Sequence, residues 1–188
     1  MNADTTPCGT TTRDIACENA GTADIDVRIR ELGPGRFDVL DAVLAALSPT
    51  SRYRRFHTSA PRPTPQVLAL LAAVDGRSHI AVAAFTGSGR PVGIARIIAV
   101  PGGRSELAVE VADDWQGRGI GARLVRAVVE RGRAAGHRVV HADVLAENVA
   151  AQALFLSVFP AAVAVSGGHE VGFAAELAAP RDPVLVAA

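Results

Sequence analysis

The sequence predicts an α+β domain in which helices pack on a mixed sheet. The first observation is composition: 49% of the 188 residues are hydrophobic and 20% are charged, which is enough apolar matter for one sizeable core. The second is order: after a first strand and two helices come three strand-like segments separated by glycine-rich turns, and then helix, strand, helix and two strands. We expect this domain to span residues 25–179, with a disordered polar head at 1–24 and a tail at 180–188.

The first half of the domain follows from apolar spacing between turn signals. Alternating apolar and polar residues predict a strand that the Gly-Pro-Gly at 33–35 ends, and helical spacing predicts a helix that the Ser-Pro at 48–49 stops. Thr64 as N-cap and Pro65 as first helical residue begin a second helix. The predicted elements are a strand at 27–32, a helix at 37–47, a polar, arginine-rich turn at 51–57 and a helix from 64 to about 74.

Glycine-rich turns organise the second half. The turns at 86–90 and 101–104 separate three apolar segments, which we expect to form consecutive antiparallel strands. Gly136 closes the long helix that follows them. The predicted elements are strands at 79–85, 91–100 and 106–111, a helix at 120–135, a strand at 138–144, a helix at 149–159 and strands at 161–165 and 170–177.

The segment from Val109 to Ala122 is the most informative in the chain. It contains a Val-x-Val strand, a polar turn and the sequence Gln-Gly-Arg-Gly-Ile-Gly at 116–121, which opens directly into an apolar-periodic helix. Glycines let the backbone approach a ligand closely, and the amides at a helix start have no intrahelical acceptor and lie at the positive end of the helix dipole. The segment therefore predicts a site for a phosphate-bearing ligand.

A dinucleotide is one such ligand. Gly117-x-Gly119-x-x-Ala122 formally satisfies the dinucleotide fingerprint, and Asp143 at the end of the next strand is a candidate ribose partner. In that fold, however, the first glycine follows its strand almost at once and opens a βαβ unit. Here residues 112–116 intervene and three antiparallel strands come first, so a nicotinamide cofactor is the less favoured alternative.

A different family fits this loop better. The Gln116–Gly121 loop resembles the pyrophosphate loop, [Gln/Arg]-x-x-Gly-x-[Gly/Ala], of the GCN5-related N-acetyltransferases (GNAT), and residues 146–155, Ala-Glu-Asn-Val-Ala-Ala-Gln-Ala-Leu-Phe, are similar to that family's second signature. Residues 47–56 resemble a segment of the bacterial protein-lysine acetyltransferase (Pat-like) subgroup. The resemblance implies a GNAT-type α/β/α fold with a mixed, mostly antiparallel sheet of six to seven strands, about four helices, and acetyl-CoA as acetyl donor.

The resemblance also implies a set of binding residues around the loop. Val111 would offer its backbone to the thioester carbonyl, and Asn148 would contact the cofactor at the start of the last helix while also fitting an N-cap role. No metal site is expected. The implied cofactor-binding residues are Val109, Val111, Gln116, Gly117, Arg118, Gly119, Ile120, Gly121, Ala122 and Asn148.

The pKa of a lysine ammonium is about 10.4, so the amine is protonated at neutral pH. Its acetylation therefore requires a proton acceptor. Glu106 and Glu110 share one face of the predicted strand at 106–111. Glu106 falls where similar family members keep their general base, so it is the predicted catalytic residue. Glu110 is the second candidate, with charge balance for a nearby arginine as its alternative role. The family's tyrosine acid falls at Phe155, which has no proton to give.

These residues lead to a hypothesis with two alternatives. We expect direct acetyl transfer to a primary amine, first of all a protein lysine ε-amine, in a ternary complex with Glu106 as base. The alternatives are acetylation of a small-molecule amine, such as an antibiotic, polyamine or amino acid derivative, and a non-catalytic acetyl-CoA sensor, which Phe155 motivates. Tyr53 and His141 are less favoured candidates for an acid or a base. The arginines at 52, 54 and 55 are expected on a solvated face.

Charge and targeting signals limit the partners. The formal net charge is zero, which argues against a nucleic-acid partner, and no apolar stretch approaches the roughly 20 residues of a membrane span. The first thirty residues lack the pattern of a secretory signal, so a cytoplasmic location is expected, with Cys8 and Cys17 as free thiols. The expected partner is the acceptor protein or small-molecule amine, and the expected state is a monomer or a homodimer.

Overall fold

The computed structural model describes residues 26–58, 60 and 62–177. The predicted head at 1–24, with Cys8 and Cys17, and the predicted tail at 180–188 lie outside the described residues.

The centre of the fold is a seven-stranded sheet in the order β1-β2-β3-β4-β5-β7-β6. All neighbouring strands pair antiparallel except β4 and β5, which are parallel, so the predicted mixed, mostly antiparallel sheet is confirmed. The strands are β1 (Val27–Glu31), β2 (His79–Thr86), β3 (Pro91–Val100), β4 (Arg104–Val111), β5 (Val139–Leu145), β6 (Val163–Gly167) and β7 (Glu170–Glu176).

Five α-helices and one short 3-10 helix accompany the described part of the sheet, where about four helices were predicted. The additional helix is α2, in the segment that we predicted as a polar turn. The Ser48 side chain accepts a hydrogen bond from the Ser51 amide, and Pro49 is the first helical residue, so the Ser-Pro pair that stops one helix also caps the next. The helices are α1 (Phe37–Ala45), α2 (Pro49–Phe56), α3 (Pro65–Ala72), η1 (Asp113–Trp115), α4 (Ile120–Ala134) and α5 (Val149–Val158).

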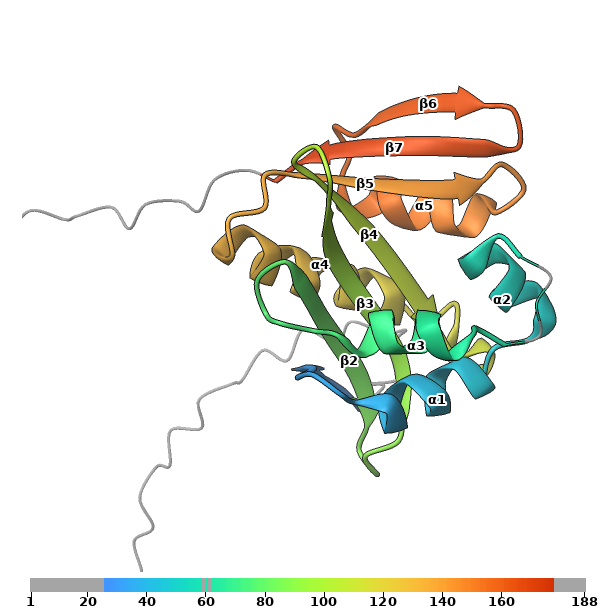
Figure 1. Ribbon diagram of the computed structural model, residues 1–188. Coiled ribbons are helices and arrows are strands. Elements are labelled where there is room, and N and C mark those ends of the chain that lie inside the picture. Colours follow the sequence, from blue (N-terminus) through green and yellow to red (C-terminus); the bar gives the residue numbers. More distant parts are fainter. Residues whose placement is uncertain (1–25, 59, 61, 178–188) are drawn as a thin grey trace, which may run out of the picture.

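The helices cover the two faces of the sheet and enclose two apolar cores (Figure 1). One core lies between the sheet and α4 with α5, and it includes Leu124, Val125 and Phe155. The other lies between the sheet and α1 with α3, and it includes Leu40 and Leu71. Alternate residues of each strand therefore face different helices, which decides on which side of the sheet a functional side chain lies.

The sheet opens between β4 and β5. These two strands pair through Glu106 and His141, whereas β5 pairs with β7 along its whole length. Beyond that single pair the two strands diverge, and the edge of β4 toward β5 has no paired strand. A slot through the sheet results, and it lies next to the start of α4.

Candidate active site

A cleft of about 590 Å³ occupies the slot between β4 and β5. Its walls come from these two strands, from the starts of α4 and α5, and from α2, which presents Ser51, Arg54 and Arg55 on one helical face. The predicted cofactor residues that line it are Val109, Val111, Gln116, Gly117, Gly119, Ile120, Gly121, Ala122 and Asn148. Arg118 does not line the cleft, and its guanidinium lies over the ring of Trp115, 5.1 Å from the ring centre.

The glycine loop turns the start of α4 into the cleft. Gly117 and Gly119 have φ values of 71° and 75°, a left-handed conformation that favours glycine. Gly119 is the N-cap of α4 and supplies no side-chain hydrogen bond to it. Gly121 permits close helix packing, since a Cβ there would lie 3.1 Å from Leu154 Cδ2 of α5. The backbone amides of the first turn of this fifteen-residue helix are thus offered to an anion.

The Gln116 side chain holds the loop in place. Its Nε2 donates to the Val111 carbonyl at 2.9 Å and lies 3.3 Å from both Ser51 Oγ and Asp113 Oδ1. These contacts join the end of β4, the 3-10 helix and α2. Asn148 has a similar double position: its side chain caps α5 by accepting from the Ala151 amide at 3.3 Å, and it also lines the cleft.

The cleft reaches both faces of the sheet. Val109 and Val111 of β4 pack against the core under α4 and α5, as Ala142 and Val144 of β5 do. Because side chains alternate along a strand, Glu106 and Glu110 lie on the opposite face, the face that α2 covers. A ligand anchored at the start of α4 and a second ligand approaching past α2 would therefore meet inside the slot.

Glu110 is buried in an ion-pair network on the α2 face. Its carboxylate accepts from Arg96 Nη2 at 2.7 Å and from Arg55 Nε at 2.7 Å, and its side chain is 1% exposed. Burial by itself would raise the pKa of Glu110, but the charges of Arg96 and Arg55 and their hydrogen bonds hold the pKa below its ordinary value. Glu110 therefore stays ionised with both oxygens occupied, which makes it a poor proton acceptor and confirms its alternative role as a countercharge.

This network corrects one prediction and adds a residue. Arg55 was expected on a solvated face, yet its side chain is 18% exposed and bound to Glu110. Arg96 was not predicted at all: its side chain is 1% exposed, and Nη1 donates to the Leu71 carbonyl of α3 at 3.0 Å. Burial lowers the pKa of Arg96, although the Glu110 charge opposes this. A lone arginine inside the apolar run of β3 was the available sequence signal.

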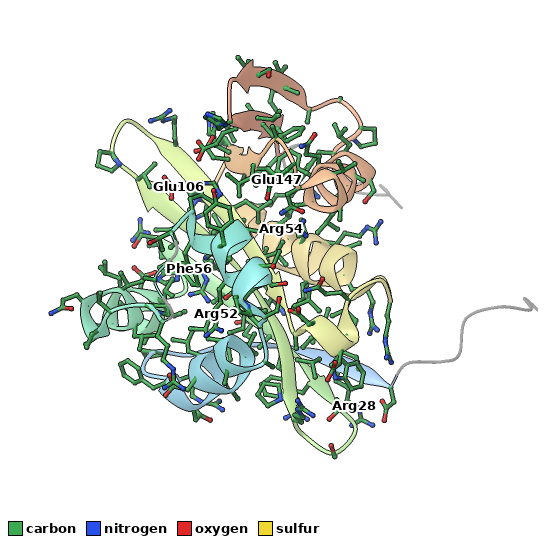
Figure 2. The ribbon with its side chains drawn as sticks, turned by 90° about the vertical axis from the view of Figure 1, so that its right-hand side faces the viewer. Arg28, Arg52, Arg54, Phe56, Glu106 and Glu147 are labelled. Atoms are coloured by element: carbon green, nitrogen blue, oxygen red, sulfur yellow. The ribbon has the colours of Figure 1, made fainter. Side chains whose placement is uncertain are left out.

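Glu106 lies outside the lining of the cleft. It is exposed near the start of β4, next to His141, at the closed end of the slot. Figure 2 shows α2 crossing in front of this region, with Glu106 above it and Arg54 on the side toward α5. Glu106 and Glu110 share a face, as the alternation predicts, but only Glu110 contacts the cleft directly.

The remaining candidates lie in different environments. Phe155 lines the cleft and packs in an aromatic cluster, with its ring 4.7 Å from Phe159 and 5.0 Å from Phe173 between centres. Tyr53 is 42% exposed on α2 and does not line the cleft. Within residues 26–58, 60 and 62–177, no cluster of three or more His, Cys, Asp or Glu side chains could bind a metal. No helix in that part of the chain has the length and apolar character of a membrane span.

Comparison with known sequences points in the same direction as the geometry. The model of the Acetyltransferase (GNAT) family matches residues 42–159, which contain the glycine loop and the α5 signature. Acetyltransferase PA5475 of Pseudomonas aeruginosa is 35% identical over 106 residues, which make up 54% of this chain and 57% of that protein. The chain thus matches little more than half of this relative.

Solved structures share the fold. The GNAT domain of S. lividans PAT is similar with a TM-score of 0.73 and 22% identity, over 80% of this chain and 90% of that one. A phosphinothricin acetyltransferase of Sinorhizobium meliloti, in complex with AcCoA, has a TM-score of 0.66 and 14% identity over 80% and 88% of the chains. A cAMP-binding acyltransferase of Mycobacterium smegmatis has a TM-score of 0.54 and 27% identity over 84% of this chain and 46% of that one.

Proposed function

Since the chain belongs to the acetyltransferase (GNAT) family, we propose that it transfers the acetyl group of acetyl-CoA to a primary amine, and in the first place to a protein lysine ε-amine. The observation that carries the proposal is the slot between β4 and β5, with an uncapped helix N-terminus at one side and α2 at the other. Such a slot lets two substrates approach from opposite faces of the sheet and react in a ternary complex.

The donor side of the slot fits acetyl-CoA. The amides of residues 117–121 would hold the pyrophosphate at the start of α4. The edge of β4 beyond Glu106 is not paired with β5, so its backbone groups are available to the amides of the pantetheine arm, much as a sheet edge accepts an added strand. Val109 and Val111 supply an apolar wall there, and a Val111 backbone amide would stabilise the developing oxyanion.

The acceptor side requires a base, and Glu106 is our candidate. Its carboxylate is exposed on the α2 face, while Glu110 is held by two arginines. Glu106 would take a proton from the acceptor ammonium through water, after which the amine nitrogen attacks the thioester carbon. The C–N bond forms and the C–S bond breaks, and the nitrogen passes its second proton to the departing thiolate, so that CoA leaves as the thiol. The thiol of CoA has a pKa of about 8.5, so its thiolate is an adequate leaving group even though Phe155 cannot donate a proton.

The charges on α2 favour a substrate with one ammonium group over a polyamine. Arg54 and Arg55 both line the cleft, so a second cationic group near the reacting ammonium would be repelled. A lysine side chain presents one ammonium at the end of an apolar stem, which suits this wall. A small monoamine is the second candidate substrate. A sensor without turnover is the third, since Phe155 stands where a proton donor is expected.

The experiment uses isotope-labelled acetyl-CoA with a desalted lysate, with the small-molecule fraction added back in a parallel tube. The sequence contains no lysine, so label on the enzyme itself cannot be lysine acetylation. We expect label in protein bands that is lost in Glu106→Gln and kept in Glu130→Gln, an exposed glutamate of α4. Label only in small metabolites would favour the second candidate. Binding of acetyl-CoA without any transfer would favour the sensor.

A further inference from the structure

Two carboxylates line the cleft, and their surroundings are opposite. Glu110 is buried and held by Arg55 and Arg96. Asp143 of β5 is exposed, and its carboxylate makes no hydrogen bond or ion pair with the described residues. A carboxylate that lines a reaction cleft and engages no protein cation is available to a cationic ligand. We propose that Asp143 binds the ammonium group of the acceptor, an inference that rests on the proposed acetyl transfer.

Strand alternation places Asp143 on the acceptor side of the sheet. Val140, Ala142 and Val144 belong to, or pack against, the core under α4 and α5. Asp143 therefore points to the other face, together with His141. That is the face on which Glu106 and Glu110 of β4 lie and over which α2 crosses. The start of α4, which suits the pyrophosphate, belongs to the opposite side, so Asp143 does not compete for the acetyl donor.

The neighbouring strand leaves the Asp143 carboxylate uncovered. Asp143 pairs with Gly172 of β7, and a Cβ at Gly172 would lie 3.4 Å from Asp143 Oδ1. A larger side chain at 172 would extend over the carboxylate. Because glycine stands there, the oxygen atoms stay accessible from the α2 side. The sheet thus supports Asp143 from beneath and leaves its outer surface open to a ligand.

The register relates Asp143 to Glu106. Glu106 pairs with His141, and Asp143 lies two positions further along β5 toward the open end of the slot. With a strand separation near 4.8 Å and a rise near 3.3 Å per residue, the two Cα atoms are about 8 Å apart before the strands diverge. This spacing allows Asp143 to hold the ammonium while a water molecule connects the same nitrogen to Glu106. Asp143 then positions the nucleophile, and Glu106 accepts the proton.

The ligand class is a primary alkylammonium whose remainder is neutral or acidic. Arg54 and Arg55 are the cationic side chains that α2 contributes to the cleft that Asp143 of β5 also lines. A ligand with its ammonium at Asp143 directs the rest of the molecule toward these positive side chains. A lysine side chain, or a monoamine of similar length, satisfies both ends.

A binding experiment in which no acetyl transfer can occur tests this inference. CoA replaces acetyl-CoA, and calorimetry compares pentylammonium with the uncharged isostere pentanol. We expect the wild-type chain to bind pentylammonium about tenfold more tightly than pentanol, and Asp143→Asn to lose this preference while binding CoA normally. Asp41→Asn, at an exposed aspartate of α1, is the matched control and should keep the preference. Equal binding of pentylammonium by wild type and Asp143→Asn, or no binding at all, overturns the inference.

Kinetics with a lysine derivative blocked at its α-amine and carboxylate give a second readout. Asp143→Asn should raise KM about tenfold with a smaller change in kcat, whereas Glu106→Gln should mainly lower kcat. A loss of kcat without a change in KM for Asp143→Asn would make Asp143 the base and overturn its binding role. A chain that binds pentylammonium through Asp143 but acetylates no amine would refute the proposed function alone.

Discussion

Arg55 Nε lies 2.7 Å from Glu110 Oε2, and this contact joins α2 to the buried face of β4. No side chain of α2 is fully buried, although Phe56 at its end packs against the core under α1 and α3, so polar contacts add to its attachment. At its start the Ser48 amide donates to Asp113, and just after its end His57 Nδ1 lies 2.6 Å from Glu170 of β7. Charge and hydrogen bonding therefore fix the start, the middle and the end of the cleft wall that α2 forms.

Arg55→Met should destabilise the fold by about 2 kcal/mol, because it removes one of the two cations that hold a buried carboxylate. Urea unfolding followed by circular dichroism measures the change. Arg54→Met is the matched control, since Arg54 is exposed and should change the unfolding free energy by less than about 0.5 kcal/mol. Equal effects of the two substitutions would contradict the prediction.

The stability of the protein should decrease in acid partly through Glu110. Its folded pKa lies below the ordinary value of 4.5, so its stabilising contribution is fully present above pH 4.5 and is lost as the pH falls through the folded pKa. In Glu110→Gln this contribution is absent at every pH. The difference in unfolding free energy between wild type and Glu110→Gln should therefore be large at pH 7 and shrink below pH 4.5. A difference that is constant with pH would refute this assignment.

Gly119→Ala should weaken acetyl-CoA binding about tenfold, because alanine at a φ of 75° is strained and the strain distorts the loop that we propose as the pyrophosphate site. Isothermal titration calorimetry measures the affinity. Gly35→Ala is the matched control: its φ is 72°, a Cβ there meets nothing within 4 Å, and it does not line the cleft. Both variants should lose similar stability, and only Gly119→Ala should lose affinity.

Phe155→Tyr should increase kcat by a factor of a few, since a phenol in the cleft can protonate the departing thiolate. The gain is expected to be small because the thiolate already leaves tolerably. Steady-state acetylation of the blocked lysine derivative measures it, with thermal unfolding as a check that the aromatic cluster tolerates the hydroxyl. A lower kcat at unchanged stability would argue against a missing proton donor.

Local signals in the sequence predicted most elements correctly. Thr64 caps α3 by accepting from the Val67 amide, as its position before Pro65 predicts. The glycine loop opens α4, and Gly136 follows its end. Helix α2 was missed because a Ser-Pro pair is equally a stop for one helix and a start for the next. Caps and turns depend on a few adjacent residues, so they can be recognised without knowledge of the fold.

The sequence by itself thus determined most elements in their order, the glycine loop at the start of α4 and the family resemblance, whereas the surroundings of the acidic side chains depended on tertiary structure. Pairing of Arg96 with Ala108 makes Arg96 a diagonal neighbour of Glu110, and the docking of α2 adds Arg55. The single pair between β4 and β5 opens the slot that leaves Asp143 accessible. These relationships join residues far apart in the chain, and strand register and helix docking, which arise from packing of the whole core, decide them.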